Sequence, residues 1–285
     1  MTTVAEIIQN RLPDMTRAER QLVDAILGDY PMSGLGSITE LAARADVSTP
    51  TVARMAQKLG FSGYPEFQAS LRAELGEMIS GPIEKREIWG RGLPEEHILS
   101  RYAEAATRNM RGTLDQIDPE AFDRVTALVA DPARRVFIAG GRITGALARY
   151  LYLHLQMIRS DVTLIPGEAS WPHHMLDIRP GDALLVFDIR RYENTTLVLG
   201  EMAHDRGAEI VLFTDQWRSP IHRLADVTFA ARIVAPSAWD STMSLVFLTE
   251  TLVAAAQEAL WETVKERTDE LEAAFDRTRL FRKFT

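Results

Sequence analysis

The sequence predicts an α/β protein in which an all-helical N-terminal domain precedes a five-stranded parallel sheet flanked by helices. The 285 residues suffice for two domains of roughly 150 residues each. Apolar residues recur at helical spacing through residues 1–79, whereas short, β-branched-rich apolar runs alternate with helical patterns after Arg134. Apolar residues make up 46% and charged residues 25% of the chain, which is ordinary globular usage and excludes a disordered protein.

The most informative part of the helical domain runs from Ser37 to Leu59. The spacing of Ile38, Leu41 and Ala42 predicts a short amphipathic helix, and the segment 45–47 predicts a tight turn after it. Ser48 is a favourable N-cap for a second helix, and Pro50 falls in its first turn, where a missing N–H costs little. This is the layout of a helix-turn-helix, whose second helix offers its N-terminal half to the major groove of DNA.

The second helix separates its apolar and polar side chains. Apolar positions at spacings of three and four face inward, namely Val52, Met55, Ala56 and Leu59. The polar positions left outside are Thr49, Thr51, Arg54, Gln57 and Lys58. Between Arg44 and Arg72 four basic residues face two acidic ones, so this segment is positive although the chain carries a net charge of −8. A plain three-helix bundle with a solvated polar face is the alternative interpretation.

Two Gly- and Pro-rich breaks separate this domain from the rest. They are Ser80-Gly81-Pro82 and the segment 90–94, and one connecting helix is expected from Glu95 to about Ile117. We therefore expect a DNA-binding domain over 1–79, a linker and connecting helix over 80–117, and a second domain over 118–285.

The second domain is predicted to hold a parallel sheet. Strands are expected in the apolar runs at 136–139, 162–165, 183–187, 210–213 and 227–229. The clearest helices between them span 145–158 and 193–205, and residues 240–275 predict one long helix or two. Strands that are apolar on both faces and alternate with helices indicate a sheet covered on both sides.

Composition also limits the chemistry. The chain has no cysteine, which excludes disulfides, thiolate metal sites and a cysteine nucleophile. No apolar run approaches the roughly 18 residues of a membrane span, and no basic stretch precedes an apolar block near Met1. A cytoplasmic protein without membrane contact and without a cofactor is expected.

The run Val47 to Phe67, which contains Lys58-Leu59-Gly60-Phe61-Ser62-Gly63-Tyr64, resembles the recognition-helix signature of the MurR/RpiR transcriptional regulators. This resemblance implies an N-terminal helix-turn-helix domain joined to a sugar isomerase (SIS) domain that binds a small effector and assembles a homodimer or homotetramer. It implies operator DNA as a partner. The residues expected to contact DNA are Ser48, Thr49, Thr51, Arg54, Gln57, Lys58 and Tyr64.

An effector site is expected beyond the carboxyl ends of the strands, where open parallel sheets bind ligands. Two loops there lead into helices, at 140–145 and 188–196, and a glycine-rich helix N-terminus favours anions. The residues expected to contact the effector are Gly141, Arg142, Thr144, Asp188, Arg190, Arg191, Tyr192 and Thr195.

Both loops depart from the usual SIS pattern. SIS domains carry Gly-x-Gly-x-Ser and Ser-x-Ser-Gly-x-Thr loops that hold a sugar phosphate. Here Arg142 replaces a glycine, Thr144 stands for the first-loop serine, and Asp188, Arg190 and Arg191 replace Ser, Ser and Gly. Guanidinium groups suit carboxylate or phosphate, so the expected effector is a sugar phosphate, a sugar acid or another anionic metabolite.

Three alternatives stay open. The arginines could only form salt bridges with acids such as Glu168 and Asp188, which would leave a pocket without a ligand and the domain a pure interaction module. The chain could be a sugar-phosphate isomerase with Glu168 and His173 as acid and base, but that function predicts intact hydroxyl-rich loops. His173-His174 resembles half a metal site without further ligands, so no metal and no catalytic residue are expected. The apolar face of Ser244 to Trp261 is expected to take part in subunit contact.

Overall fold

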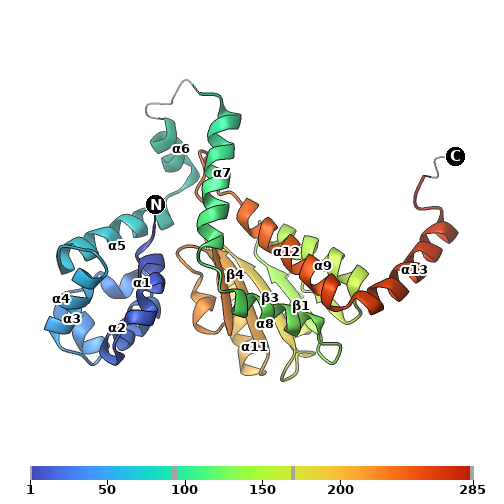
Figure 1. Cartoon of the computed structure of the whole chain (residues 1–285), viewed down its shortest axis with the longest axis horizontal. Helices are drawn as coiled ribbons and strands as arrows, with labels where there is room; N and C mark the ends of the chain where they lie inside the picture. Colours follow the sequence, from blue (N-terminus) through green and yellow to red (C-terminus); the bar gives the residue numbers. More distant parts are fainter. Residues whose placement is uncertain (1, 91–95, 168–170, 283–285) are drawn as a thin grey trace.

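A computed structural model describes residues 2–90, 96–167 and 171–282. Figure 1 shows a helical domain at one end, a helical linker rising beside it, and a sheet domain from which the last helix projects. The helical domain contains α1 (Val4–Arg11), α2 (Arg17–Leu27), α3 (Ile38–Arg44), α4 (Thr49–Lys58) and α5 (Tyr64–Ile79), with the short 3-10 turns Leu12–Asp14 and Met32–Gly34.

Capping boxes fix where the first three helices begin. Thr3 with Glu6, Thr16 with Glu19, and Ser37 with Glu40 each exchange side-chain and backbone hydrogen bonds. Downstream apolar residues then form one core, which includes Leu22, Ile26, Leu41, Met55 and Leu71.

The linker forms two helices, α6 (Pro82–Gly90) and α7 (Ile98–Leu114). α5 ends at Ile79 and α6 begins at Pro82, and α7 lies within the range of about 95–117 in which a connecting helix is expected. The second expected break, at 90–94, lies mostly outside the described residues.

The helical domain docks on the sheet domain through an ion pair, against which the linker helix α7 packs. Arg232 Nε, at the end of β5 (Val227–Ala231), donates to Glu6 Oε1 of α1 at 2.7 Å. Gly112 of α7 packs directly on this guanidinium, since a Cβ at that position would lie 2.2 Å from Arg232 Nη1. A side chain at position 112 would therefore have to displace the Arg232 guanidinium, which is ion-paired with Glu6.

The described residues of the second domain contain the five predicted strands. They are β1 (Val136–Gly140), β2 (Val162–Leu164), β3 (Ala183–Asp188), β4 (Glu209–Asp215) and β5, in the order β2-β1-β3-β4-β5, and all neighbours pair in parallel. The predicted fold class is confirmed.

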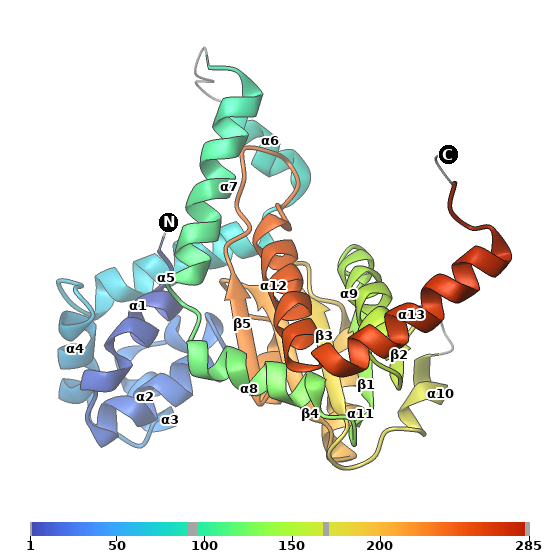
Figure 2. The same cartoon turned by 45° about the vertical axis from the view of Figure 1, so that its right-hand side comes forward.

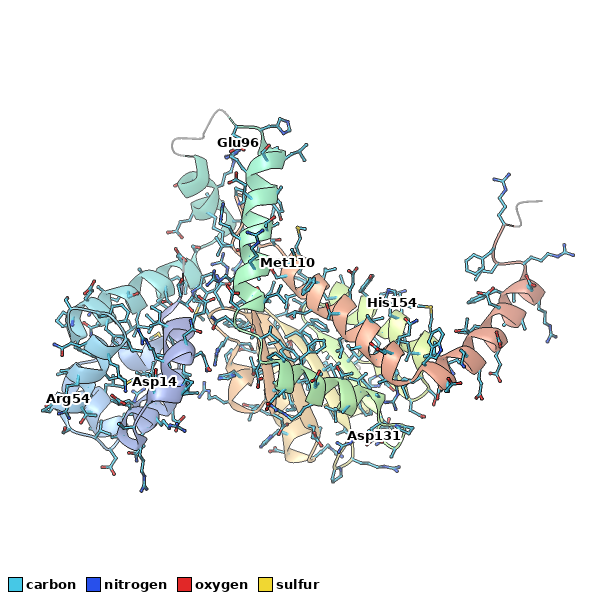
Figure 3. The ribbon with its side chains drawn as sticks, in the orientation of Figure 1. Asp14, Arg54, Glu96, Met110, Asp131 and His154 are labelled. Carbon is cyan, nitrogen blue, oxygen red and sulfur yellow. The ribbon has the colours of Figure 1, made fainter. Side chains whose placement is uncertain are left out.

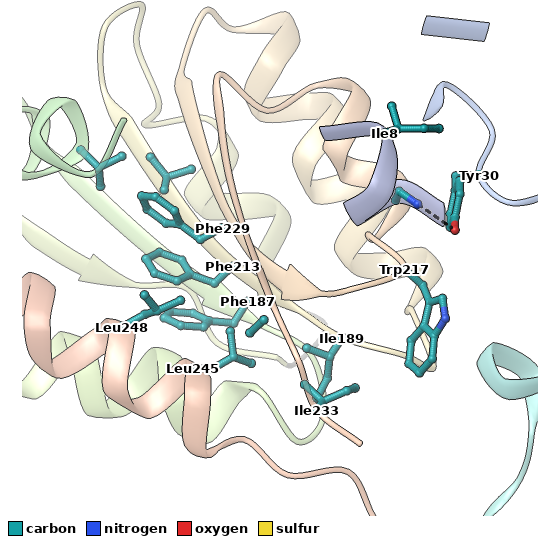
Figure 4. Packing of buried hydrophobic residues seen from close by; sticks show 14 of the residues in the cluster. Ile8, Tyr30, Phe187, Ile189, Phe213, Trp217, Phe229, Ile233, Leu245 and Leu248 are labelled. Atoms are coloured by element: carbon teal, nitrogen blue, oxygen red, sulfur yellow. Dashed lines mark hydrogen bonds between the residues drawn. The ribbon is translucent and has the colours of Figure 1, made fainter. Parts of the chain in front are cut away.

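Alternate strand residues supply the two faces of the sheet. One face packs under α8 (Pro119–Ala130), α9 (Gly145–Ile158) and α12 (Met243–Ala259); the other packs under α10 (Trp171–Met175) and α11 (Asn194–Asp205). Figure 4 shows Phe187, Phe213 and Phe229 in a row, with Leu245 and Leu248 beside the Phe187 end, and neighbouring ring centroids lie 4.6 and 5.3 Å apart.

The last segment is two helices rather than one. Leu260 separates α12 from α13 (Trp261–Thr278), and their axes differ by 98°. Figures 1 and 2 show α13 leaving the body of the domain, and Val264 is the one residue of this helix that is buried among those described. No single helix in the described ranges is long and apolar enough to cross a membrane. The bent pair α12–α13 is long and apolar enough only when its two helices are taken together.

Candidate functional site

The helix pair α3–α4 has the predicted helix-turn-helix geometry. Asp46 adopts a positive φ of 52° in the turn, Ser48 is the N-cap of α4, and Pro50 lies in its first turn. Two hydrogen bonds end α4: Gly60 N donates to Gln57 O at 2.9 Å, and Phe61 N donates to Ala56 O at 3.1 Å. Gly60 has φ of 98°, so this helix end requires glycine and explains the Leu-Gly-Phe part of the signature.

The exposed side of α4 presents polar groups to solvent. Arg54 and Gln57 are exposed, and neither side chain has a hydrogen-bond partner among the described residues. Ser48 Oγ and Thr51 Oγ1 lie 2.9 Å apart and share one hydrogen, while Thr49 is half-buried beside them. Figure 3 places Arg54 at the outer edge of the domain, away from the sheet.

Two of the residues expected to contact DNA are instead tied into the domain. Lys58 Nζ donates to Glu19 Oε2 at 2.8 Å and to Asp14 O at 2.7 Å. Tyr64 is buried, and its hydroxyl donates to the carbonyls of Gly34 and Gly36. The ion pair of Lys58 and the buried hydroxyl of Tyr64 therefore give both signature residues a structural role.

A cavity of 220 Å³ lies at the carboxyl ends of the strands. Its walls come from the two predicted loops, from a loop before α12, and from the start of the linker. The lining residues are Ser80, Pro82, Lys85, Gly141, Arg142, Ile143, Thr144, Asp188, Ile189, Arg190, Arg191, Glu193, Ala238, Trp239, Asp240 and Thr242. The loops predicted at 140–145 and 188–196 therefore meet, and the linker contributes to the same cavity.

Arg190 is the centre of a charged network in this cavity. Its Nη2 donates to Asp240 Oδ1 at 2.6 Å, and Lys85 Nζ of the linker donates to the same oxygen at 2.8 Å. Arg190 Nη1 also donates to the carbonyl of Glu77 in α5, and its guanidinium lies 4.4 Å from the ring centroid of Trp217. Arg190 thus joins the sheet domain to the last helix of the helical domain.

The side chains of the other two arginines are placed differently from that of Arg190. Arg142 and Arg191 are exposed, and neither guanidinium has a hydrogen bond or ion pair within the described ranges. Thr144, by contrast, is buried. Its hydroxyl donates to Phe187 O at 2.7 Å and accepts from Gly141 N at 2.8 Å. Thr144 therefore holds the shape of the first loop.

Asp188 faces the interior rather than an arginine. Asp188 is 2% exposed, and its carboxyl accepts from Ser219 Oγ. Burial raises the pKa of Asp188 to about 7, helped by the nearby charges of Asp215 and Glu193. The pairing considered between Asp188 and the arginines is absent here, since Arg190 pairs with Asp240 instead.

Tyr192 and Thr195 lie outside this cavity. The Tyr192 hydroxyl donates to the buried Asp215 at 2.8 Å. Thr195 is exposed and lines a neighbouring cavity of 690 Å³, together with Arg149 and Trp171. Glu168, considered above as an acid, lies outside the described residues, and no group of three metal-binding side chains occurs in the described part of the chain.

Three residues of this site were missed by sequence reasoning: Lys85, Asp240 and Glu193. Lys85 and Asp240 carry no local signal, since they meet across 155 positions of sequence. Glu193 does carry a local signal, because it stands at the position where the usual Ser-x-Ser-Gly-x-Thr loop has its threonine. Its Oε1 accepts from Arg142 N at 2.6 Å.

Known proteins share both halves of this architecture. Residues 2–78 match the family model of the helix-turn-helix domain of the rpiR family, and residues 131–256 match that of the SIS domain. The HTH-type transcriptional regulator HexR of Pseudomonas aeruginosa is 28% identical over 227 residues, which cover 75% of this chain and 74% of HexR.

Two solved structures share the fold. The sugar isomerase domain of an RpiR transcription factor from Sphaerobacter thermophilus has a TM-score of 0.59 at 22% identity and covers 62% of this chain and 99% of that one. The Vibrio vulnificus NanR protein, solved with ManNAc-6P, has a TM-score of 0.55 at 20% identity and covers 98% of this chain and 99% of that one.

Proposed function

The chain belongs to the RpiR family of transcriptional regulators that join a helix-turn-helix domain to a SIS domain, and from this premise we propose that it binds operator DNA through α4 and senses a small carbohydrate-derived or anionic metabolite in the 220 Å³ cavity. The exposed N-terminal half of α4 supports the DNA contact, because hydroxyl and guanidinium groups there suit phosphates and base edges.

The sharing of the cavity between two parts of the chain supports the sensing role. Ser80, Pro82 and Lys85 belong to the linker, whereas Asp240 and the arginines belong to the sheet domain. A ligand that contacts both parts binds better to one relative position of linker and sheet domain than to another. Because the ligand favours one of these positions, its binding shifts the protein toward that position and so changes the affinity for operator DNA.

The same loops argue against the isomerase alternative. The hydroxyl of Thr144 already accepts from Gly141 N and donates to the Phe187 carbonyl of β3, and two of the positions for the second-loop hydroxyls carry Asp188 and Arg190 instead. Regulation therefore accounts for the site better than catalysis does.

Operator binding with and without ligand tests the sensing role. The operator is first located by footprinting on DNA around the chain's own gene. Thermal shift against sugar acids and sugar phosphates then selects a ligand, here with gluconate and glucose 6-phosphate as the first pair. Arg191→Ala is expected to weaken ligand binding by roughly 10-fold to 150-fold, because a charged hydrogen bond contributes roughly 1.5–3 kcal/mol.

Ligand-free operator binding of Arg191→Ala should match the wild type, because Arg191 is exposed and has no partner within the described ranges. Arg124→Ala, on the exposed side of α8, is the matched control. A wild-type response in Arg191→Ala would place sensing elsewhere. Arg190→Ala is a poor test, since Arg190 also holds Asp240 and the Glu77 carbonyl.

A homodimer is a further part of the proposal. The face of α12 expected to meet a second subunit is used inside the chain, where Leu245, Leu248 and Leu252 are buried. Exposed apolar side chains lie instead on α9 and α13, with Leu153 49%, Met157 44% and Trp261 50% exposed. Together with the projecting α13, they favour subunit contact through these helices.

Leu153→Glu is accordingly expected to shift the protein from at least a dimer toward the monomer, because it places a charge in the apolar contact. Light scattering at micromolar concentration measures the mass. Leu176→Glu is the control, because it places the same charge on a leucine that is 69% exposed but lies after α10, away from α9 and α13. A wild-type monomer under these conditions would contradict the proposed assembly.

A further inference from the structure

The Glu193 carboxylate occupies the anion-binding position of the first loop. Its Oε1 accepts the backbone N–H of Arg142 at 2.6 Å. A Cβ on Gly141 would lie 2.9 Å from the same oxygen, so glycine at 141 leaves room for the carboxylate. Glu193, Gly141 and Arg142 line both the 220 Å³ and the 690 Å³ cavities, and the carboxylate stands where the two adjoin.

A strand-to-helix loop of this kind offers its backbone N–H groups to anions. Here a side chain of the protein already accepts from one of those groups. A phosphate entering the loop would have to replace this bond and then lie beside a carboxylate. Like charges at such short range repel strongly where water is partly excluded.

The carboxylate nevertheless leaves hydrogen-bonding capacity for a ligand. An ionised glutamate offers two oxygens with several acceptor sites, and one bond to Arg142 N uses only one of them. Hydroxyl groups can donate to the remaining sites. The exposed guanidinium of Arg191, in the same cavity, suits a carboxylate.

We propose that Glu193 is a specificity-determining residue that excludes phosphate from the Gly140–Gly145 loop, so that the site takes a polyhydroxylated, non-phosphorylated ligand such as a sugar acid. This rests on the proposed sensing role of the cavity. The two loops are compatible with sugar phosphates and with sugar acids, and the carboxylate of Glu193 favours the sugar acids.

Restoring the hydroxyl at this position tests the proposal. Glu193→Thr removes the carboxylate, and Glu193→Gln removes the charge alone. Glu193 is the N-cap of α11 and its side chain makes no capping hydrogen bond, so threonine, a good N-cap, should preserve the fold. Glu201→Gln removes an exposed charge from the same helix and is the matched control.

Isothermal titration with glucose 6-phosphate, inorganic phosphate and neutral glucose gives the readout. Both phosphate compounds are expected to bind Glu193→Thr about tenfold or more tightly than the wild type or Glu201→Gln, with a smaller gain in Glu193→Gln and none for glucose. Equal phosphate affinity in wild type and Glu193→Thr overturns the proposal. An equal gain for glucose also overturns it, because the effect would then be one of space.

Ligand-free operator binding by the same proteins separates this inference from the proposed function. If all variants bind the operator and phosphate affinity does not change, only the role of Glu193 fails. If the wild type binds no operator, the regulatory function itself fails.

Discussion

Arg54→Ala is expected to weaken operator binding by roughly 5-fold to 150-fold, since a lost contact to a base edge costs about 1–3 kcal/mol. Arg54 is exposed on α4 and has no partner within the described ranges, so its loss should leave the fold unchanged. Binding to unrelated DNA should fall less, because phosphate contacts dominate non-specific binding. Electrophoretic mobility shift at fixed salt concentration measures both affinities.

The control for Arg54 is Arg108→Ala, which removes the same charge from an exposed position on α7. The circular dichroism spectra of both variants should match that of the wild type. An equal loss of affinity on all sequences would make Arg54 a phosphate contact. Unchanged operator binding would exclude α4 as the helix that reads the DNA.

The fold was predictable from sequence because its signals are local. Strands apolar on both faces, such as 183–187, predicted a covered parallel sheet, and the structure confirms all five strands. The predicted helix 145–158 is α9. Ser48 and Pro50 marked the start of α4 because caps and first-turn prolines act within a few residues.

The site was predictable only in part, because its chemistry depends on pairings across the chain. Arg190 lies at the cavity, but its partner Asp240 is 50 positions away and carries no signal of its own. Tyr192 follows Arg191 in the loop, yet its hydroxyl is directed at Asp215 because that buried carboxyl needs donors. Sequence patterns identify which loops meet, but tertiary packing decides which side chains remain free for a ligand.

Asp240→Asn is expected to lower the free energy of unfolding by about 3 kcal/mol, because it removes one partner from a largely buried charge network. The Arg190 and Lys85 side chains are only 5% and 12% exposed, so solvent compensates little for the lost carboxylate. Burial already lowers the pKa of Lys85, and the interaction with Asp240 opposes that shift. Urea unfolding measures the change, with Asp205→Asn on the exposed side of α11 as control.

The linker gives this prediction its second readout. Asp240 holds Lys85 of α6, and its other partner, Arg190, holds the Glu77 carbonyl of α5. Asp240→Asn should therefore loosen the linker and change ligand-free operator affinity, whereas Asp205→Asn should not. Adding Lys85→Met to Asp240→Asn should restore part of the lost stability, because it removes one of the two unpaired buried charges. A loss of less than about 1 kcal/mol in Asp240→Asn, the range of an exposed ion pair, would show that this network does not hold the linker on the cavity.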